Sequence, residues 1–178
     1  IDLPDITVLS LDERISLGEC YNYAIRHASF DYIAKFDDDD YYAPRYLTKQ
    51  MAAFNYTYAD IIGKTCRFIY FQSVSILGLY EASPQFTYVD YVVGATMIFK
   101  KDILDHIKFR NINRGEDSEF QKDCLRQDRK IFSVDKYNYV TIRHHSFEPH
   151  TYVFSDCEYL NSCQTTWKTR DYISPISR

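Results

Sequence analysis

Apolar and polar positions vary along this chain in a way that predicts strands and helices in turn. The runs at 6–11 and 31–36 are rich in β-branched and aromatic residues, so both are expected to be strands. A helix is expected between them, with Cys20, Ala24 and Ile25 on one face. The order strand, helix, strand is typical of an α/β protein.

Further strands and helices follow in a less regular order. Pro44 stands in the first turn of a second expected helix, where proline is tolerated, and this helix ends near Asn55. Glycines interrupt the apolar runs that come next, so these runs predict short strands. The interrupting glycines are Gly63, Gly78 and Gly94. The remaining expected elements are a helix at 118–127 and a strand within 130–146.

The pattern as a whole predicts one α/β domain. Residues 1–178 form this single domain, and 147–178 are expected to be a polar, irregular C-terminal extension. No internal repeat, low-complexity segment or linker interrupts the chain.

Composition narrows the class of protein. Hydrophobic residues make up 46% of the 178 residues and charged residues 26%, as in a soluble globular domain. The net charge of −4 and the lack of a Lys/Arg cluster argue against a nucleic-acid partner. No apolar run approaches the roughly 20 residues of a transmembrane helix.

Five cysteines without CxxC spacing predict reduced thiols in a cytosolic protein. A Cys157–Cys163 bridge is the alternative to that interpretation. The expected location is the cytoplasm, with the inner face of the membrane as a second option.

The stretch FDDDDYYAP places four aspartates, Asp37 to Asp40, directly after the second expected strand. Ligands of open α/β sheets bind at the carboxyl ends of strands. Asp37 and Asp39 can point the same way from an extended segment, and hard oxygen ligands suit Mg²⁺ or Mn²⁺. The alternative is a solvated acidic loop that caps the helix after Pro44.

A second group of candidate ligands lies in RHHSFEPHT, at 143–151. His145 and His150 are candidate metal ligands, and Arg143 is a candidate contact for a phosphate. The alternative is a surface turn whose histidines make ordinary hydrogen bonds.

The block SLGECYNYAIRHASFDYIAKFDDDDYYAPRYL resembles the central block of GT-A-fold glycosyltransferases of family 2. The shared features are a glycine, an Asn in a helix, a small-residue turn, a strand and an aspartate cluster. Here they are Gly18, Asn22, Ala28-Ser29 and Asp37 to Asp40. YVVGATMIFKKDIL and RGEDSEF resemble two downstream blocks of the same family, in the same order.

This resemblance implies a GT-A-like, Rossmann-like fold with a mixed sheet flanked by helices, and a role for each acidic residue. Asp37 would contact the nucleotide, and Asp39 would bind the divalent cation that bridges the diphosphate. Asp38 and Asp40 belong to the same cofactor-binding loop, in which Asp40 would hold the loop or a metal-bound water. Asn22 and Arg143 are assigned to cofactor binding as well.

The resemblance also implies an inverting sugar transfer. Asp117 would be the catalytic base, and Glu116 would orient it or touch the acceptor. Acidic residues are also frequent in the first turns of helices, so capping is the alternative for both. The implied donor is a nucleotide-diphosphate sugar, a UDP-sugar first, and the implied acceptor is a glycan, lipid-linked or protein hydroxyl, such as that of a bacterial cell-surface polysaccharide.

Members of this family begin with a β-α-β portion that grips the nucleotide, and this chain starts at the equivalent of the third strand. The missing portion is therefore an expected partner, and we expect the segment alone to turn over poorly. Two other hypotheses remain at this point: a non-catalytic binding module of the same fold, and a metal-dependent phosphoesterase.

Overall fold

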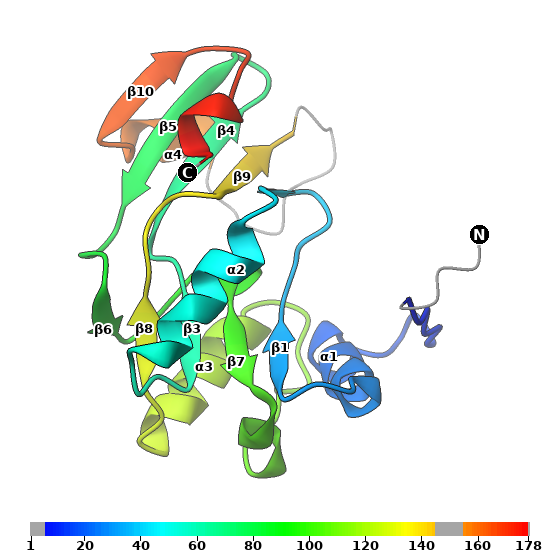
Figure 1. Ribbon diagram of the computed structural model, residues 1–178. Helices are drawn as coiled ribbons and strands as arrows, with labels where there is room; N and C mark the ends of the chain where they lie inside the picture. The colour runs from blue at the N-terminus through cyan, green and yellow to red at the C-terminus, as the bar shows by residue number, and fades with distance from the viewer. Residues whose placement is uncertain (1–5, 145–154, 178) are drawn as a thin grey trace.

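The computed structural model describes residues 6–144 and 155–177. It contains two five-stranded sheets, one above the other in Figure 1. The first has the strand order β1 (Tyr32–Ala34), β7 (Ile98–Lys100), β3 (Ile61–Gly63), β8 (Ile131–Ser133) and β6 (Thr87–Val89). The second has the order β10 (Thr165–Lys168), β5 (Ile76–Glu81), β4 (Cys66–Phe71), β9 (Tyr139–Arg143) and β2 (Tyr41–Tyr42).

Four α-helices and four short 3₁₀ helices accompany the sheets in the described part of the chain. The α-helices are α1 (Leu17–His27), α2 (Tyr46–Met51), α3 (Glu116–Arg126) and α4 (Asp156–Asn161). The 3₁₀ helices are η1 (Ala52–Asn55), η2 (Gly94–Thr96), η3 (Lys101–Asp105) and η4 (Ser174–Ile176).

Two pairs of consecutive strands join the sheets. The chain runs from β3 directly into β4 and from β8 into β9, and the pairs β3–β8 and β4–β9 are parallel. The other strand pairs are antiparallel, so both sheets are mixed. The expected α/β class with a mixed sheet flanked by helices is confirmed.

Helices cover the first sheet on both faces, α2 in front and α3 behind in Figure 1. Ile61 and Ile131 pack with Phe120 of α3, whereas Ile62 and Phe132 pack with Ala53 of η1. Because neighbouring residues of a strand point to opposite faces, a strand buried on both faces is apolar throughout. This is why the sequence shows continuous apolar runs at these strands.

The segment 6–11 is not a strand, which makes that expectation wrong. It has no regular secondary structure, and Ile6 and Val8 are 62% and 87% exposed. A strand needs a neighbour for its backbone hydrogen bonds, and no described strand pairs with this segment. Its β-forming side chains therefore do not suffice to make it one.

The buried face of α1 also differs from the expected one. Gly18, Asn22 and Ile25 are buried, whereas Ala24 is exposed. A Cβ on Gly18 would overlap the carbonyl oxygen of Arg110, so the helix approaches the neighbouring backbone closely there. Because a glycine and an asparagine form most of this face, an apolar periodicity could not reveal it.

Regular elements lie in the segment expected to be irregular. Within its described residues, α4, β10 and η4 form, and β10 pairs antiparallel with β5 at the edge of the second sheet. Every residue of β10 is exposed, so the strand leaves no alternation of apolar and polar positions. Ser155 and Glu158 form a capping box at the start of α4, a signal that was readable in the sequence.

The segment 92–96 is held by side-chain amides rather than by a sheet. The N–H of Val92 donates to Oε1 of Gln121 at 2.7 Å, and Nε2 of Gln121 donates to the carbonyl of Val92 at 3.0 Å. Nε2 of Gln50 donates to the carbonyl of Thr96 at 3.0 Å. The segment is thereby fixed between α3 and α2.

Replacing Gln121 with Ala should therefore destabilise the protein. Both backbone groups of Val92 would be left buried without a partner, and we expect a loss of about 3 kcal/mol in the free energy of unfolding. Urea denaturation measures this loss. Lys122→Ala is the control on the same helix, because its exposed ion pair with Glu119 should contribute less than about 0.5 kcal/mol. Equal losses in the two variants would contradict the role of the amide.

Candidate active site

The acidic run forms the loop between β1 and β2, at the carboxyl end of β1. One carboxylate oxygen from each of Asp37, Asp39 and Asp40 lies within 4.8 Å of the others. Asp38 is exposed and is not part of this group. The structure thus brings three of the four aspartates together, and we call these three the acidic triad.

Asp40 attaches this loop to the second sheet. Its Oδ2 accepts a hydrogen bond from the Tyr139 hydroxyl at 2.5 Å, and its Oδ1 accepts one from the N–H of Ile142 at 2.9 Å. Burial raises the pKa of the Asp40 carboxyl to about 6, although both hydrogen bonds act against that rise. Asp40 therefore holds the loop on β9.

Asp37 has a cationic partner that the sequence analysis missed. Nζ of Lys35 lies 2.5 Å from Oδ1 of Asp37, and only 9% of the lysine side chain is exposed. Burial acts to lower the pKa of Lys35, but the charge and hydrogen bond of Asp37, together with those of Tyr21, raise that pKa above its usual value. A lysine within the apolar run YIAKF was the available signal.

A histidine also supports the loop. Nε2 of His144 lies 2.9 Å from the backbone oxygen of Asp39, and Nδ1 lies 3.3 Å from Oε1 of Gln72. The two histidines expected to be metal ligands, His145 and His150, lie outside the described residues. His144 was in the same motif but was not singled out.

Asp117 stands in the first turn of α3, after Gly115. Its Oδ1 accepts a hydrogen bond from the N–H of Ser118 at 2.7 Å. A Cβ on Gly94 would overlap Oδ2 of Asp117, so the carboxylate lies directly against the backbone of the 92–96 segment. Gln121, one turn further along α3, binds the same segment. The position of Asp117 thus depends on the absence of a side chain at Gly94.

Glu116 precedes Asp117 and is buried. Burial raises its pKa, and the charge of Asp117 adds to the rise while that of Lys35 opposes it. Asp37 also acts on Glu116, so the second acidic pair lies within electrostatic reach of the Lys35–Asp37 ion pair.

Two members of the acidic triad, Asp37 and Asp40, share one cleft of about 750 Å³ with Asp117. Asp37, Asp40 and Asp117 line it, and the carboxylate of Asp39 belongs to the same cluster. The rest of the lining comes from the segment that carries Gly94, from residues 82–91, which include β6, and from one face of the second sheet. Acidic side chains that are distant in the sequence therefore face a common space.

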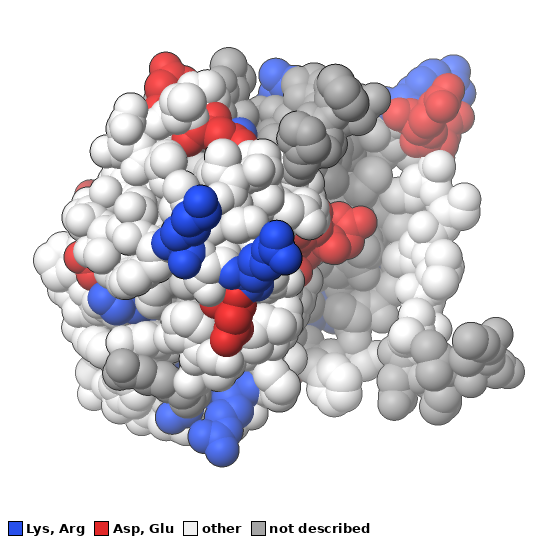
Figure 2. Space-filling view, turned by 90° about the horizontal axis from the view of Figure 1, so that it is seen from above, with Lys and Arg blue, Asp and Glu red and all other residues white. Residues whose placement is uncertain are grey.

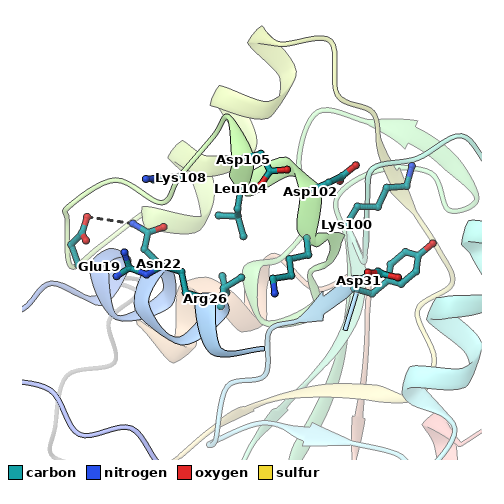
Figure 3. Close-up of a pocket in the computed structure, with 12 residues that line it drawn as sticks. Glu19, Asn22, Arg26, Asp31, Lys100, Asp102, Leu104, Asp105 and Lys108 are labelled. Atoms are coloured by element: carbon teal, nitrogen blue, oxygen red, sulfur yellow. Dashed lines mark hydrogen bonds between the residues drawn. The ribbon is translucent and has the colours of Figure 1, made fainter. Parts of the chain in front are cut away.

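Asn22 does not line this cleft. Its Nδ2 donates to the carbonyl of Phe109 at 2.8 Å, and its Oδ1 accepts from the N–H of Phe109 at 3.0 Å. It borders a different cavity of about 670 Å³, together with Glu19 and Asp31 (Figure 3). Asp31 precedes β1 whereas Asp37 follows it, so this cavity lies at the other end of the strand. The structure gives Asn22 a partner in the backbone, and its assignment to the cofactor stays a prediction.

Arg143 is likewise absent from the residues that line the cleft. Its guanidinium is buried beneath α4, where Nε donates to Oδ1 of Asp156 at 2.9 Å and the group lies 5.6 Å from the centre of the Tyr159 ring. Its contact with a phosphate therefore stays a prediction, and the observed partner is a carboxylate of the chain itself.

The donor set of the triad fits a hard divalent cation. It consists of carboxylate oxygens, and such ions usually take one or two protein carboxylates and complete their shell with water and phosphate oxygens. Lys35 and Tyr139 hold two of the three carboxylates in place, whereas Asp39 is exposed. Asp37, Asp39 and Asp40 are thus the residues that could hold Mg²⁺ or Mn²⁺.

The face of the molecule seen from above carries dispersed charge. On the face seen in Figure 2, Lys and Arg side chains are scattered among Asp and Glu rather than gathered in one patch.

Cys157 and Cys163, like the other three cysteines, are free thiols. Among the described residues, no helix has the length and apolar character needed to cross a membrane.

Comparisons with known proteins identify the family and the fold. The family model described as glycosyl transferase family 2 matches residues 2–107, a range that contains the acidic triad and Gly94 but ends before Asp117. The crystal structure of S. aureus TarS 1–349 in complex with UDP-GlcNAc is similar, with a TM-score of 0.55 and 18% sequence identity.

That similarity covers 79% of this chain and 43% of the TarS chain, so this chain spans less than half of that structure. The likeness in fold confirms the expected GT-A-like architecture. No curated protein matches the chain.

The contact between Gly94 and Asp117 yields a test that needs no ligand. Gly94→Ala should lower the free energy of unfolding by about 2 kcal/mol, because the new methyl group overlaps the carboxylate. In an Asp117→Ala background the same substitution should cost less than half as much. A double-mutant cycle followed by urea denaturation measures this coupling, and additive losses would show that the two residues do not constrain each other.

Proposed function

The chain belongs to glycosyl transferase family 2, and from that premise we propose that it carries the metal and catalytic-base side of an inverting sugar transferase. The proposed donor is a nucleotide-diphosphate sugar, a UDP-sugar first, and the acceptor is a hydroxyl of a glycan, a lipid-linked sugar or a protein. One observation carries this proposal: Asp37 and Asp40 of the acidic triad line one cleft together with Asp117, and the carboxylate of Asp39 lies beside theirs.

The proposed role of each carboxylate follows from its surroundings. Asp39 is the exposed member of the triad and the proposed principal metal ligand, whereas Asp40 is held by β9. Asp37 is the proposed nucleotide contact, kept in place by Lys35. A bound Mg²⁺ or Mn²⁺ would neutralise charge on the departing diphosphate.

Asp117 is the proposed base. The acceptor oxygen forms a bond to C1 of the sugar while the bond from C1 to the diphosphate oxygen breaks, and the hydroxyl proton passes to the Asp117 carboxylate. A single displacement of this kind inverts C1. Contact with Gly94 and the hydrogen bond from Ser118 hold Asp117 in a defined position, as a base must be if it is to meet the hydroxyl. Glu116 is a proposed positioning residue.

Metal-dependent binding of the nucleotide is the first consequence. UDP should bind with Mn²⁺, and Asp39→Asn or removal of the metal with EDTA should weaken its affinity at least tenfold, because Asp39 is the exposed ligand of the triad. Calorimetry measures the affinity. Asp38→Asn, a change of the same size in the neighbouring residue outside the triad, should change it less than twofold. Binding that survives both Asp39→Asn and EDTA would favour a non-catalytic binding module.

The base is tested separately. In Asp117→Asn, UDP and Mn²⁺ should bind as in the wild type, but release of UDP from UDP-GlcNAc with water as acceptor should fall at least a hundredfold. Asp123→Asn is the matched control on α3, because Asp123 is engaged with Arg110 and Arg126 at the surface. Unchanged UDP release in Asp117→Asn would remove Asp117 from the chemistry.

A further inference from the structure

Arg67 is an unusual member of the cleft. It lies in β4 on the face of the second sheet that borders the cleft, with Thr65, Tyr139 and Thr141. It is only 7% exposed, and it is the single Lys or Arg among the described residues that line the cleft. The sequence analysis did not single it out.

The partners of its guanidinium leave it incompletely satisfied. The group stacks on Tyr80 and Tyr159, at 4.9 and 5.9 Å from the ring centres, and Nη2 donates to the Tyr159 hydroxyl at 2.7 Å. Nε is buried and has no hydrogen-bond acceptor, and no described carboxylate forms an ion pair with Arg67.

Arg143 provides an internal comparison. Its guanidinium lies 5.6 Å from the centre of the same Tyr159 ring, and its Nε pairs with Oδ1 of Asp156 at 2.9 Å. A buried charge is normally compensated by an opposite charge, and a guanidinium keeps its charge at any physiological pH. Arg143 meets this requirement within the chain, whereas for Arg67 the described residues supply two aromatic rings and one hydroxyl.

We propose that Arg67 binds an oxyanion of the acceptor, a phosphate or carboxylate beside the hydroxyl that receives the sugar. This inference rests on the proposed function and names the substrate class of that site. In the proposed function the diphosphate of the donor is held by the cation at the acidic triad, and Asp117 meets the acceptor. The wall of β4 and β5 that carries Arg67 is the basic part of the same cleft. A planar guanidinium suits both oxyanions because it donates two parallel hydrogen bonds.

Glycerol 3-phosphate and glycerol are suitable probes, since they differ only in the phosphate. Their binding is followed by ligand-observed NMR with saturating UDP and Mg²⁺, so that the donor site is filled, and again without UDP. Glycerol 3-phosphate should bind better than glycerol, and Arg67→Met should weaken it at least tenfold. The affinity for UDP with Mg²⁺ should change less than twofold in Arg67→Met.

Two variants serve as controls. Arg110→Met removes an exposed guanidinium outside the cleft and should leave glycerol 3-phosphate binding unchanged. Arg67→Lys keeps a positive charge but loses the planar pair of donors, and it should weaken glycerol 3-phosphate at least threefold. If Arg67→Met does not fold, as judged by circular dichroism, Arg67→Lys decides the question.

The outcomes separate the possible sources of the anion. Parallel loss of UDP and glycerol 3-phosphate affinity would assign Arg67 to the donor diphosphate and overturn the proposal. Equal binding of glycerol 3-phosphate by wild type and variants would overturn it too and would leave Arg67 a packing residue. If UDP fails to bind wild-type protein, the proposed function fails, while the titrations without UDP still decide whether Arg67 holds an anion.

Discussion

Repulsion among neighbouring carboxylates is the constraint around which this molecule is arranged. Four consecutive aspartates follow β1, and three of them are brought within 4.8 Å of one another. The chain offsets part of that charge itself, through Lys35 at Asp37 and through two hydrogen bonds at Asp40. Burial raises the pKa of Asp40 to about 6 against the two hydrogen bonds, and the charges of Asp39 and Asp37 add smaller contributions to the rise. Asp39 is the exposed member of the triad, so a cation with water and phosphate ligands would be accommodated most easily there.

The bend between the two sheets gives this loop a cleft to face. The chain passes from β3 to β4 and from β8 to β9 through short polar segments, and polar side chains join them at the bend. Nζ of Lys64 is 2.6 Å from the carbonyl of Asp135, and the hydroxyls of Thr65 and Ser133 are 2.8 Å apart. Burial lowers the pKa of Lys64 to about 8, which means that burying its positive charge at the bend is unfavourable. The second sheet is thereby directed over the acidic loop, which brings Tyr139 and Thr141 to the cleft.

How far the sequence predicts this structure depends on the kind of signal each residue leaves. Strands buried on both faces and the loop after β1 follow from apolar runs and from a run of aspartates. The strand predicted at 6–11 is wrong because strand formation depends on a neighbouring strand. The strand β10 was not predicted because its residues are all exposed and show no alternation of apolar and polar positions. The sequence analysis missed three further residues for a different reason: Lys35, His144 and Arg67. Each is one charged or polar residue in an ordinary context, and only the fold shows that its side chain reaches the acidic loop or the cleft.

The family match alone does not relate the acidic triad to the second acidic group, Glu116 and Asp117. The family match ends at residue 107, before Glu116 and Asp117, so it cannot by itself connect them to the triad. The connection runs through the 92–96 segment, because Gln121 binds Val92 while Asp117 lies against Gly94 on the same side of α3. That segment also reaches the triad, since the hydroxyl of Tyr42 donates to Ala95 and accepts a hydrogen bond from the N–H of Asp37. A shift of the segment would therefore move both acidic groups at once, which makes it the element that couples the proposed metal site to the proposed base.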